Sequence, residues 1–293
     1  MSWIASNPLS IFQKFCINVL KCGPIPQHVA FIMDGNRRYA KQQRLDKQVG
    51  HSRGFDKLTE TLQWCLELGI REVTMYAFSI ENFNRSQEEV DALMDLAREK
   101  YARLIEEKEK LMEEGVRISV IGNLTLLPED IRKSIAEAMI MTKHNSRLFL
   151  NVAMAYTSRD EITNAVIDIT NGVKSGKLGT EDIDEELLNS CLYTNHSRKI
   201  DVLIRTSGET RLSDFLLWQS GFVQIFIADV LWPNFSIWQL LGMIFKYQRN
   251  YRELQRVTVE CRALELSTKQ QVFLDDLGCS RMGNLEQYTT LYT

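Results

Sequence analysis

HVAFIMDGNRR, at residues 28–38, is a short apolar run that passes into Asp-Gly and then into a helical pattern. The same order of a short β-rich run and a longer helical pattern recurs along the chain, with no Pro-rich or Gly/Ser-rich linker and no fixed repeat. Runs that are apolar nearly throughout are typical of strands covered on both faces. Parallel neighbours need crossover connections, which helices supply. The sequence therefore predicts a one-domain α/β fold with a mainly parallel central sheet of about six strands, flanked by helices.

The individual elements follow from the same patterns. We expect strands at 28–34, 73–79, 116–121, 148–155, 201–206 and 223–229. We expect helices at 36–47, 51–68, 86–114, 128–144, 159–174, 181–190, 212–220 and 236–264. The helix at 86–114 would be about 40 Å long, more than a crossover needs, so it is either a structural bracket or the wall of an elongated apolar cavity. The tail at 265–293 has little periodicity, and we expect it to be peripheral or partly disordered.

The composition excludes several classes of protein. With 293 residues, 44% hydrophobic and 25% charged, the chain is neither disordered nor fibrous. Its formal charge of −3 gives no general attraction to nucleic acid, so any phosphate chemistry must be local. The six cysteines form no CxxC pair and the four histidines no spaced cluster, which argues against a disulfide framework or a zinc site. We therefore expect a reduced, cytosol-facing chain.

The first 23 residues form a separate amphipathic segment. Asn7 can cap a helix with Pro8 at its first position, and Gly23-Pro24 can end it. Its apolar stripe consists of Ile11, Phe12, Phe15, Cys16, Val19 and Leu20. This helix either packs on its own domain or lies in a membrane interface. We expect no cleaved signal peptide, and no membrane span, because the longest apolar run, 222–232, is about half of the ~20 residues required.

Polar clusters follow three of the predicted strands, at the end where open parallel sheets bind ligands. They are Asp34, Gly35, Asn36, Arg37 and Arg38; Ser79, Asn82 and Arg85; and Arg205, Gly208, Arg211 and Ser213. The guanidinium group of arginine can donate two hydrogen bonds to anionic oxygens. A glycine before a helix N-terminus lets backbone N–H groups approach a phosphate. Asp34 is suited to a Mg²⁺ that bridges diphosphate oxygens. The pattern predicts two diphosphate sites and one metal carboxylate.

Each cluster taken alone also has a plainer interpretation. Asp34-Gly35 could be a capped turn, and Arg205 and Arg211 could be solvated surface charges. His51 could reach the phosphates or merely cap a helix, whereas His28, His144 and His196 are expected to be structural or to have no special role. Neither GxGxxG nor GxxxxGK[ST] occurs. No nucleophile has a paired base, but a diphosphate is itself a leaving group and needs oxyanion stabilisation and exclusion of water.

Three long segments resemble the cis-prenyltransferases, the family of undecaprenyl and dehydrodolichyl diphosphate synthases. They are HVAFIMDGNRRYA at 28–40, FSIENFNR at 78–85 and DVLIRTSGETRLSDFLLWQ at 201–219. The likeness covers about 24–250 within a catalytic domain expected at 24–264, and the N-terminal start is most like the animal dehydrodolichyl diphosphate synthase subunits. The resemblance implies the cis-prenyltransferase fold and a Mg²⁺-dependent extension of farnesyl diphosphate by successive isopentenyl diphosphates. The product would be a long polyprenyl diphosphate for dolichol synthesis and protein glycosylation.

The resemblance also implies roles for the clustered residues. Asp34 would hold Mg²⁺, and Asn36, Ser79 and Asn82 would lie near the reacting groups with it. Substrate diphosphates would be bound by Gly35, Arg37, Arg38, His51, Arg85, Arg205, Arg211 and Ser213. The growing chain would enter an apolar tunnel between helices and the sheet. A non-catalytic lipid-binding or scaffold subunit is the alternative, but it would have little need for Asp34 together with these arginines.

Two departures from the family pattern imply a heteromer. Single-chain bacterial members have a metal-binding Glu where this chain has Gln224, and the Arg-x-Gly that completes a neighbour's site is missing near 251–253. We expect a Nogo-B-receptor-like subunit to supply that tail and to anchor the complex, peripherally, on the cytosolic face of the endoplasmic reticulum membrane. Arg281-Met282-Gly283 has the right letters about 30 residues too late. A self-sufficient homodimer that uses this segment stays open as an alternative.

Overall fold

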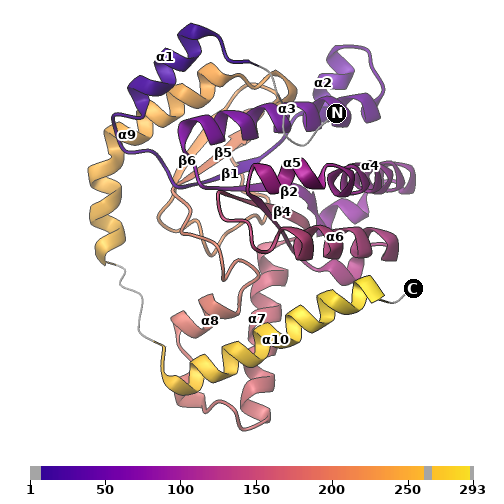
Figure 1. The fold of residues 1–293 in the computed structure, drawn as a ribbon, viewed down its shortest axis with the longest axis vertical. Coiled ribbons are helices and arrows are strands. Elements are labelled where there is room, and N and C mark those ends of the chain that lie inside the picture. The colour runs from indigo at the N-terminus through magenta and orange to yellow at the C-terminus, as the bar shows by residue number, and fades with distance from the viewer. Residues whose placement is uncertain (1–7, 261–265, 291–293) are drawn as a thin grey trace.

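Residues 8–260 and 266–290, which the computed structural model describes, fold around a six-stranded parallel sheet in the order β3-β4-β2-β1-β5-β6 (Figure 1). The strands are β1 (His28–Ile32), β2 (Glu72–Ser79), β3 (Val116–Ile121), β4 (Leu148–Tyr156), β5 (Val202–Thr206) and β6 (Gln224–Ala228). The predicted fold class is confirmed, and the predicted strand ends differ from the observed ones by at most two residues. Every residue of β1 is buried, as expected for a strand covered on both faces.

Helices cover both faces of the sheet (Figure 1). They are α1 (Ile11–Leu20), α2 (Asn36–Gln42), α3 (Lys47–Leu68), α4 (Gln87–Glu106), α5 (Lys108–Glu113), α6 (Glu129–Thr142), α7 (Ser158–Lys174), α8 (Glu185–Cys191), α9 (Ile237–Glu260) and α10 (Thr268–Thr290). Short 3-10 helices lie at Ile80–Asn84, Leu124–Leu126, Thr180–Asp182 and Trp232–Asn234. The main core packs α3, α4, α6 and α9 on one face, and a second cluster lies on the other face beneath the segment 212–223.

Two predicted helix ranges differ from the structure in ways that matter for the site. The first predicted helix ends early because Arg44 takes a left-handed φ of 55°, and α3 then begins at Lys47 rather than at 51. The long predicted helix breaks at Glu107, where ψ of 20° interrupts the helical path between α4 and α5. The wall that flanks the sheet is therefore two helices, of which α4 lies nearer the site.

The helix predicted at 212–220 is wrong. The segment forms irregular turns, with left-handed φ values at Ser213, Asp214 and Leu216. Two buried side chains, Phe215 and Leu216, pack against the sheet, and the ring of Phe215 stacks on Tyr76 at a centroid distance of 4.4 Å. These tertiary contacts outweigh the local helical preference.

Of the two expectations for the tail, peripheral or partly disordered, partial disorder is wrong for the described residues, because α10 is a 23-residue helix. Phe273 is 6% exposed and packs with Leu178 and Leu187, which belong to the layer that contains α7 and α8. Arg281 Nη2 lies 2.8 Å from Asp168 Oδ2 and donates to the carbonyl oxygen of Cys191. The helix keeps only a narrow apolar face, and for that reason the sequence pattern is weak. The boundary predicted at 264/265 for a domain stays a prediction.

The N-terminal helix is present but begins later than predicted. Ser10, not Asn7, is the N-cap of α1 and forms a capping box with Gln13, while Asn7 lies outside the described residues. Figure 1 shows α1 alongside α9, and Gln248 of α9 donates to the Leu20 carbonyl oxygen at 2.7 Å. The helix therefore packs on its own domain with one face, which buries Ile17.

The packing of α10 makes a prediction for stability. Phe273→Ala should lower the free energy of unfolding by about 3–5 kcal/mol, because it leaves a cavity against α7 and α8. Val272→Ala is the matched control: Val272 is 58% exposed, and we expect a change below about 0.5 kcal/mol. Urea unfolding followed by circular dichroism measures both. Equal, small losses would show that α10 does not pack as described.

Candidate active site

Asp34 lies directly after β1, where the chain turns into α2. Its backbone is fixed to the end of β5: the Asp34 N–H donates to Thr206 Oγ1 at 3.0 Å, and the Thr206 hydroxyl donates to the Asp34 carbonyl at 2.8 Å. Gly35 follows with φ of 107°, and a Cβ there would lie 2.9 Å from the Leu231 side chain, so only glycine fits this turn. The Gly35 N–H donates to Asp34 Oδ1 at 2.7 Å. These bonds hold the carboxylate at the carboxyl edge of the sheet.

Two arginines hold Asp34 in its anionic form. Arg205 Nη2 lies 2.8 Å from Asp34 Oδ2, and Arg38 Nη2 lies 3.5 Å from Oδ1. Burial by itself would raise the pKa of Asp34, but the hydrogen bond and charge of Arg205, with the Gly35 N–H and Arg38, outweigh burial and lower the pKa. The Asp34 side chain is still 31% exposed, so a face of the carboxylate is open to a ligand.

Arg205 connects Asp34 to the loop after β5. Its side chain is 3% exposed, and Nη1 donates to Ser213 Oγ at 2.8 Å and to the Arg211 carbonyl oxygen. The Arg211 side chain is 63% exposed and pairs with Glu209 at 2.5 Å; Glu209 in turn lies 3.2 Å from Arg38. One buried arginine thus fixes the loop, while Arg38 and Arg211 present exposed guanidinium groups around it.

A second cation cluster centres on Glu89, which the sequence analysis missed. Glu89 Oε1 lies 2.8 Å from Arg85 and 3.3 Å from Arg37, and Oε2 lies 3.6 Å from Lys47. Burial would raise the pKa of Glu89, but the charges of Arg37, Arg85 and Lys47 lower it. The Arg85 and Glu89 spacing of four along the chain was a sequence signal for one of these pairs. Helix α4 thereby orients cations that come from α2, α3 and the loop after β2.

Ser79 and Asn82 shape the loop after β2 by bonding to its backbone. Ser79 Oγ accepts from the Glu81 N–H at 3.2 Å, and Asn82 Oδ1 accepts from the Ser79 N–H at 3.1 Å. This capping box begins the 3-10 helix at Ile80–Asn84. Both residues therefore have a structural use besides the expected place near the reacting groups.

Asn36 and His51 lie where α2 crosses α3. A Cβ at Gly54 would lie 2.4 Å from Asn36 Oδ1, so this glycine permits the close crossing. Asn36 Oδ1 and His51 Nε2 are buried and have no hydrogen-bond partner among the described residues. Burial, with the nearby Arg85 charge, lowers the pKa of His51 to about 4. His51 lies inside α3 rather than at its start, so it does not serve as the helix cap.

One cavity of about 1170 Å³ collects every residue of the predicted site. Its lining includes Asp34, Gly35, Asn36, Arg37, Arg38, His51, Ser79, Asn82, Arg85, Arg205, Arg211 and Ser213. A smaller cavity of about 130 Å³ between α3, α4 and the sheet adjoins it and is mostly apolar. The two share Met33, Asn36, His51, Ala77, Phe78 and Leu93 as lining residues. A charged cleft therefore continues into an apolar pocket, as binding a diphosphate with a hydrocarbon tail requires.

The structure places Gln224, which stands where bacterial members have a Glu, and Arg281, which begins the late Arg-x-Gly segment. Gln224 begins β6, and its register partner is Val202, at the opposite end of the strands from Arg205 and Asp34. Gln224 therefore lies away from the Asp34 cluster of its own chain. Arg281 is bonded to Asp168 and to Cys191 at the end of α8, and none of these three is among the described residues that line the cleft.

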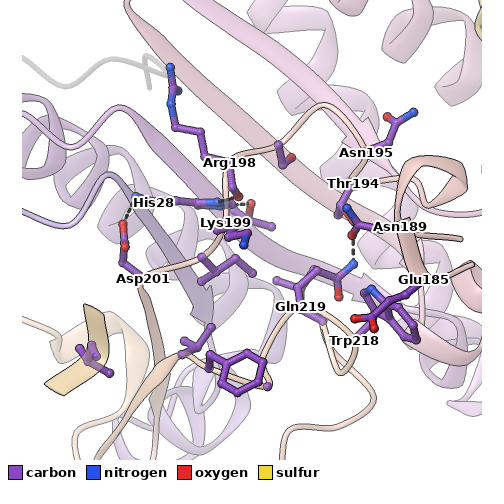
Figure 2. A pocket seen from close by; sticks show the side chains of 18 of the residues that line it. His28, Glu185, Asn189, Thr194, Asn195, Arg198, Lys199, Asp201, Trp218 and Gln219 are labelled. Carbon is purple, nitrogen blue, oxygen red and sulfur yellow. Dashed lines mark hydrogen bonds between the residues drawn. The ribbon is translucent and has the colours of Figure 1, made fainter. Parts of the chain in front are cut away.

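Another cavity, of about 430 Å³, lies at the amino ends of β1 and β5 (Figure 2). His28 is buried there and bonds to the Arg198 carbonyl oxygen and Thr74 Oγ1, as its expected structural role requires. Gln219 donates to Thr194 Oγ1 at 2.7 Å, within a network around the buried Glu161. The bonds of Gln219 fix the segment that follows Ser213. The amino edge of the sheet therefore helps to hold the loop that carries Ser213.

Asp34 is the residue that fits a magnesium ion. Among the described residues no group of three or more His, Cys, Asp or Glu side chains could hold a metal by itself. Mg²⁺ usually keeps several waters and binds through one or two carboxylates together with substrate phosphates. A single, partly open carboxylate surrounded by phosphate-binding arginines matches that donor set.

Comparison with known proteins agrees with this geometry. A family model described as putative undecaprenyl diphosphate synthase matches residues 32–255. The chain belongs to this family, the cis-prenyltransferases. The human dehydrodolichyl diphosphate synthase complex subunit is 57% identical over 256 residues, which cover 87% of this chain and 77% of that protein. A Pyrococcus horikoshii tritrans,polycis-undecaprenyl-diphosphate synthase, geranylgeranyl-diphosphate specific, is 46% identical, covering 84% of this chain and 93% of its own.

The fold of this cis-prenyltransferase also matches solved structures. Lavandulyl diphosphate synthase from Lavandula x intermedia, in complex with dimethylallyl diphosphate, has a TM-score of 0.72 and 34% identity, over 76% of this chain and 95% of that one. The predicted cis-prenyltransferase fold is thereby confirmed. The roles of the individual site residues stay predictions.

The burial of His51 makes a prediction for pH dependence. Its pKa of about 4 lies below the ordinary 6.5, so between these values the unfolded chain binds a proton that the folded chain does not. The contribution of His51 to stability is therefore complete above about pH 6.5 and falls as the pH drops toward 4. NMR titration of the imidazole should give the low pKa, and Arg85→Met should raise it. A wild-type His51 that titrates near 6.5 would contradict the buried position.

Proposed function

We propose that the protein is the catalytic subunit of a dehydrodolichyl diphosphate synthase. It extends farnesyl diphosphate with successive isopentenyl diphosphates, each added with cis geometry, to a long polyprenyl diphosphate for dolichol synthesis and protein glycosylation. The observation that carries the proposal is the charged cleft that gathers Asp34 with six arginines and opens into an apolar cavity. A scaffold or lipid carrier would need the apolar cavity but not this charged cleft.

Two sets of residues that line the cleft suit two diphosphate groups. Gly35, Asn36, Arg37 and Arg38 would hold the allylic diphosphate at the N-terminus of α2, and Arg205, Arg211 and Ser213 would hold isopentenyl diphosphate. Mg²⁺, held by Asp34, would neutralise charge on a diphosphate when bound. The allylic diphosphate leaves, the double bond of isopentenyl diphosphate attacks the allylic cation, and a proton is lost, with the departing diphosphate as its acceptor. Neutral His51 and Asn36 present, at the boundary of the apolar pocket, buried atoms that no described residue hydrogen-bonds.

A second subunit fits the geometry better than self-sufficiency. Arg281 is tied to Asp168 and Cys191 in its own chain, so it is poorly placed to complete a neighbour's site. The edge strand β6 exposes Ile225 at 42% and Ile227 at 37%, an apolar edge that a partner can cover. We propose a Nogo-B-receptor-like subunit as that partner. The human relative is named as a complex subunit, which supports a heteromer.

We also propose peripheral contact with the cytosolic face of the endoplasmic reticulum membrane. None of the described helices is both long and apolar enough to span a bilayer. The outer face of α1 exposes Ile11, Phe12, Phe15 and Val19, and α9 adds Trp238 and Phe245. The rings of Phe12 and Trp238 lie 5.7 Å apart, so the two helices present one apolar surface. Such a face can insert into a lipid interface without crossing it.

An activity assay tests the proposed reaction. Purified chain, alone and with the partner subunit, is given labelled isopentenyl diphosphate with farnesyl or geranylgeranyl diphosphate. We expect polyprenyl product from the complex, and a loss of about 10²–10³-fold with Asp34→Ala. Glu129→Gln, an exposed acid on α6, should keep wild-type activity. Full activity of the chain alone would contradict the heteromer, and an active Asp34→Ala complex would contradict the metal assignment.

Vesicle binding tests the membrane surface. Replacing both Phe12 and Phe15 by Ser should weaken co-sedimentation with phosphatidylcholine/phosphatidylserine vesicles at least about tenfold, because two large apolar groups no longer enter the lipid. Val166→Ser is the control, because Val166 is an exposed residue of α7, and this variant should bind as the wild type does. Equal binding by all three proteins would place the membrane contact elsewhere.

A further inference from the structure

A lysine lies at the inner end of the apolar cavity between α3 and α4. Lys100 is 7% exposed, and of the described residues that line this cavity it is the one with a charged side chain. The other residues at this end include Phe55, Leu58, Leu96 and Ala97. An ammonium group among apolar side chains is costly unless its charge is compensated. The tunnel of a prenyl chain is an unexpected place for it.

Contacts with Glu99 and Phe55 help to compensate the charge of Lys100. Nζ lies 2.7 Å from Glu99 Oε1, and the Glu99 side chain is 61% exposed. Nζ also lies 4.7 Å from the centroid of the Phe55 ring. Phe55 belongs to α3 and Lys100 to α4, so this cation–π contact bridges the two helices that enclose the cavity. Because Glu99 faces solvent, the Lys100 head group lies between the cavity and the outside.

The dimensions of the cavity put this contact in the path of a prenyl chain. Leu93 lines both the charged cleft and the apolar cavity, and from Leu93 to Lys100 the helix rises by about 10 Å. The cavity holds about 130 Å³, close to the volume of an engineered cavity that takes up one benzene molecule. Only a short prenyl group fits in this space. A longer chain has to displace side chains at the inner end.

We propose that Phe55 and Lys100 form a gate at the inner end of the prenyl tunnel, and that Lys100 is a specificity-determining residue for chain length. The inference rests on the proposed function. A chain that passes the gate pushes the ammonium group off the Phe55 ring toward Glu99 and solvent. The gate therefore opposes chains long enough to reach it and leaves shorter chains unaffected.

Binding of unreactive analogues tests the gate without turnover. Calorimetry gives the Kd of geranyl and of geranylgeranyl thiolodiphosphate for the wild-type chain and for Lys100→Met, which keeps the length of the side chain and removes its charge. We expect Lys100→Met to bind the geranylgeranyl analogue about two- to fivefold more tightly, the factor that such a cation–π contact contributes, and the geranyl analogue unchanged. Lys100→Arg, which keeps the cation, should retain the wild-type ratio. Lys143→Met, an exposed lysine that follows α6, is the matched control.

Phe55→Leu provides a second, uncharged test from the opposite helix. It removes the ring beneath the ammonium and should also favour the geranylgeranyl analogue, even if Lys100→Met fails to fold. Unchanged Kd ratios in the folded variants, or the same shift in Lys143→Met, would overturn the gate. A wild-type chain that binds both analogues but makes no polyprenyl product, alone or with a partner, would contradict the proposed function, while the Kd ratios would still decide on the gate.

Discussion

The ion pair between Asp34 and Arg205 joins the carboxyl ends of two neighbouring strands, and the candidate site is built around it. Arg205 is almost fully buried, and a buried guanidinium without a carboxylate would be strongly destabilising. Asp34 in turn is held by the hydroxyl of Thr206 and by the Gly35 turn. The parallel register of β1 and β5, in which Ile32 pairs with Arg205, also fixes the position of this ion pair. Because both partners are fixed, helix α2, which carries Arg38, and the loop that carries Ser213 are both placed next to this ion pair.

The site divides sharply into a charged half and an apolar half. On the charged side, the exposed Arg37, Arg38 and Arg211 form ion pairs with Glu89 and Glu209. On the apolar side, α3 and α4 enclose hydrocarbon surface. Asn36 and His51 lie at the boundary, which is where the bond between a diphosphate and its prenyl chain would be held. The low pKa of His51 keeps this boundary uncharged at neutral pH.

The strands and the strand-end residues could be predicted from the sequence because both depend on local pattern. Buried parallel strands are short apolar runs, and a polar residue directly after such a run must lie at the carboxyl edge of the sheet. The turns at 212–220 could not be predicted in this way, since they depend on distant residues: the Tyr76 hydroxyl donates to the carbonyl of left-handed Ser213, and the Ser158 N–H donates to that of left-handed Asp214. The role of Glu89 could not be predicted, because it pairs with cations from three separate segments of the chain. Helix α10 was missed because polar contacts such as Arg281 with Asp168 supplement its narrow apolar face.

Simultaneous binding of two diphosphates tests most directly whether two diphosphate sites meet around Asp34 and Arg205. Calorimetric titration of the chain with unreactive farnesyl thiolodiphosphate, and then with isopentenyl diphosphate, both with Mg²⁺ present, counts the ligands bound. One of each should bind per chain, and Arg205→Met should weaken isopentenyl diphosphate far more than the farnesyl analogue. Competition of the two ligands for a single site, or unaltered binding in Arg205→Met, would contradict this arrangement.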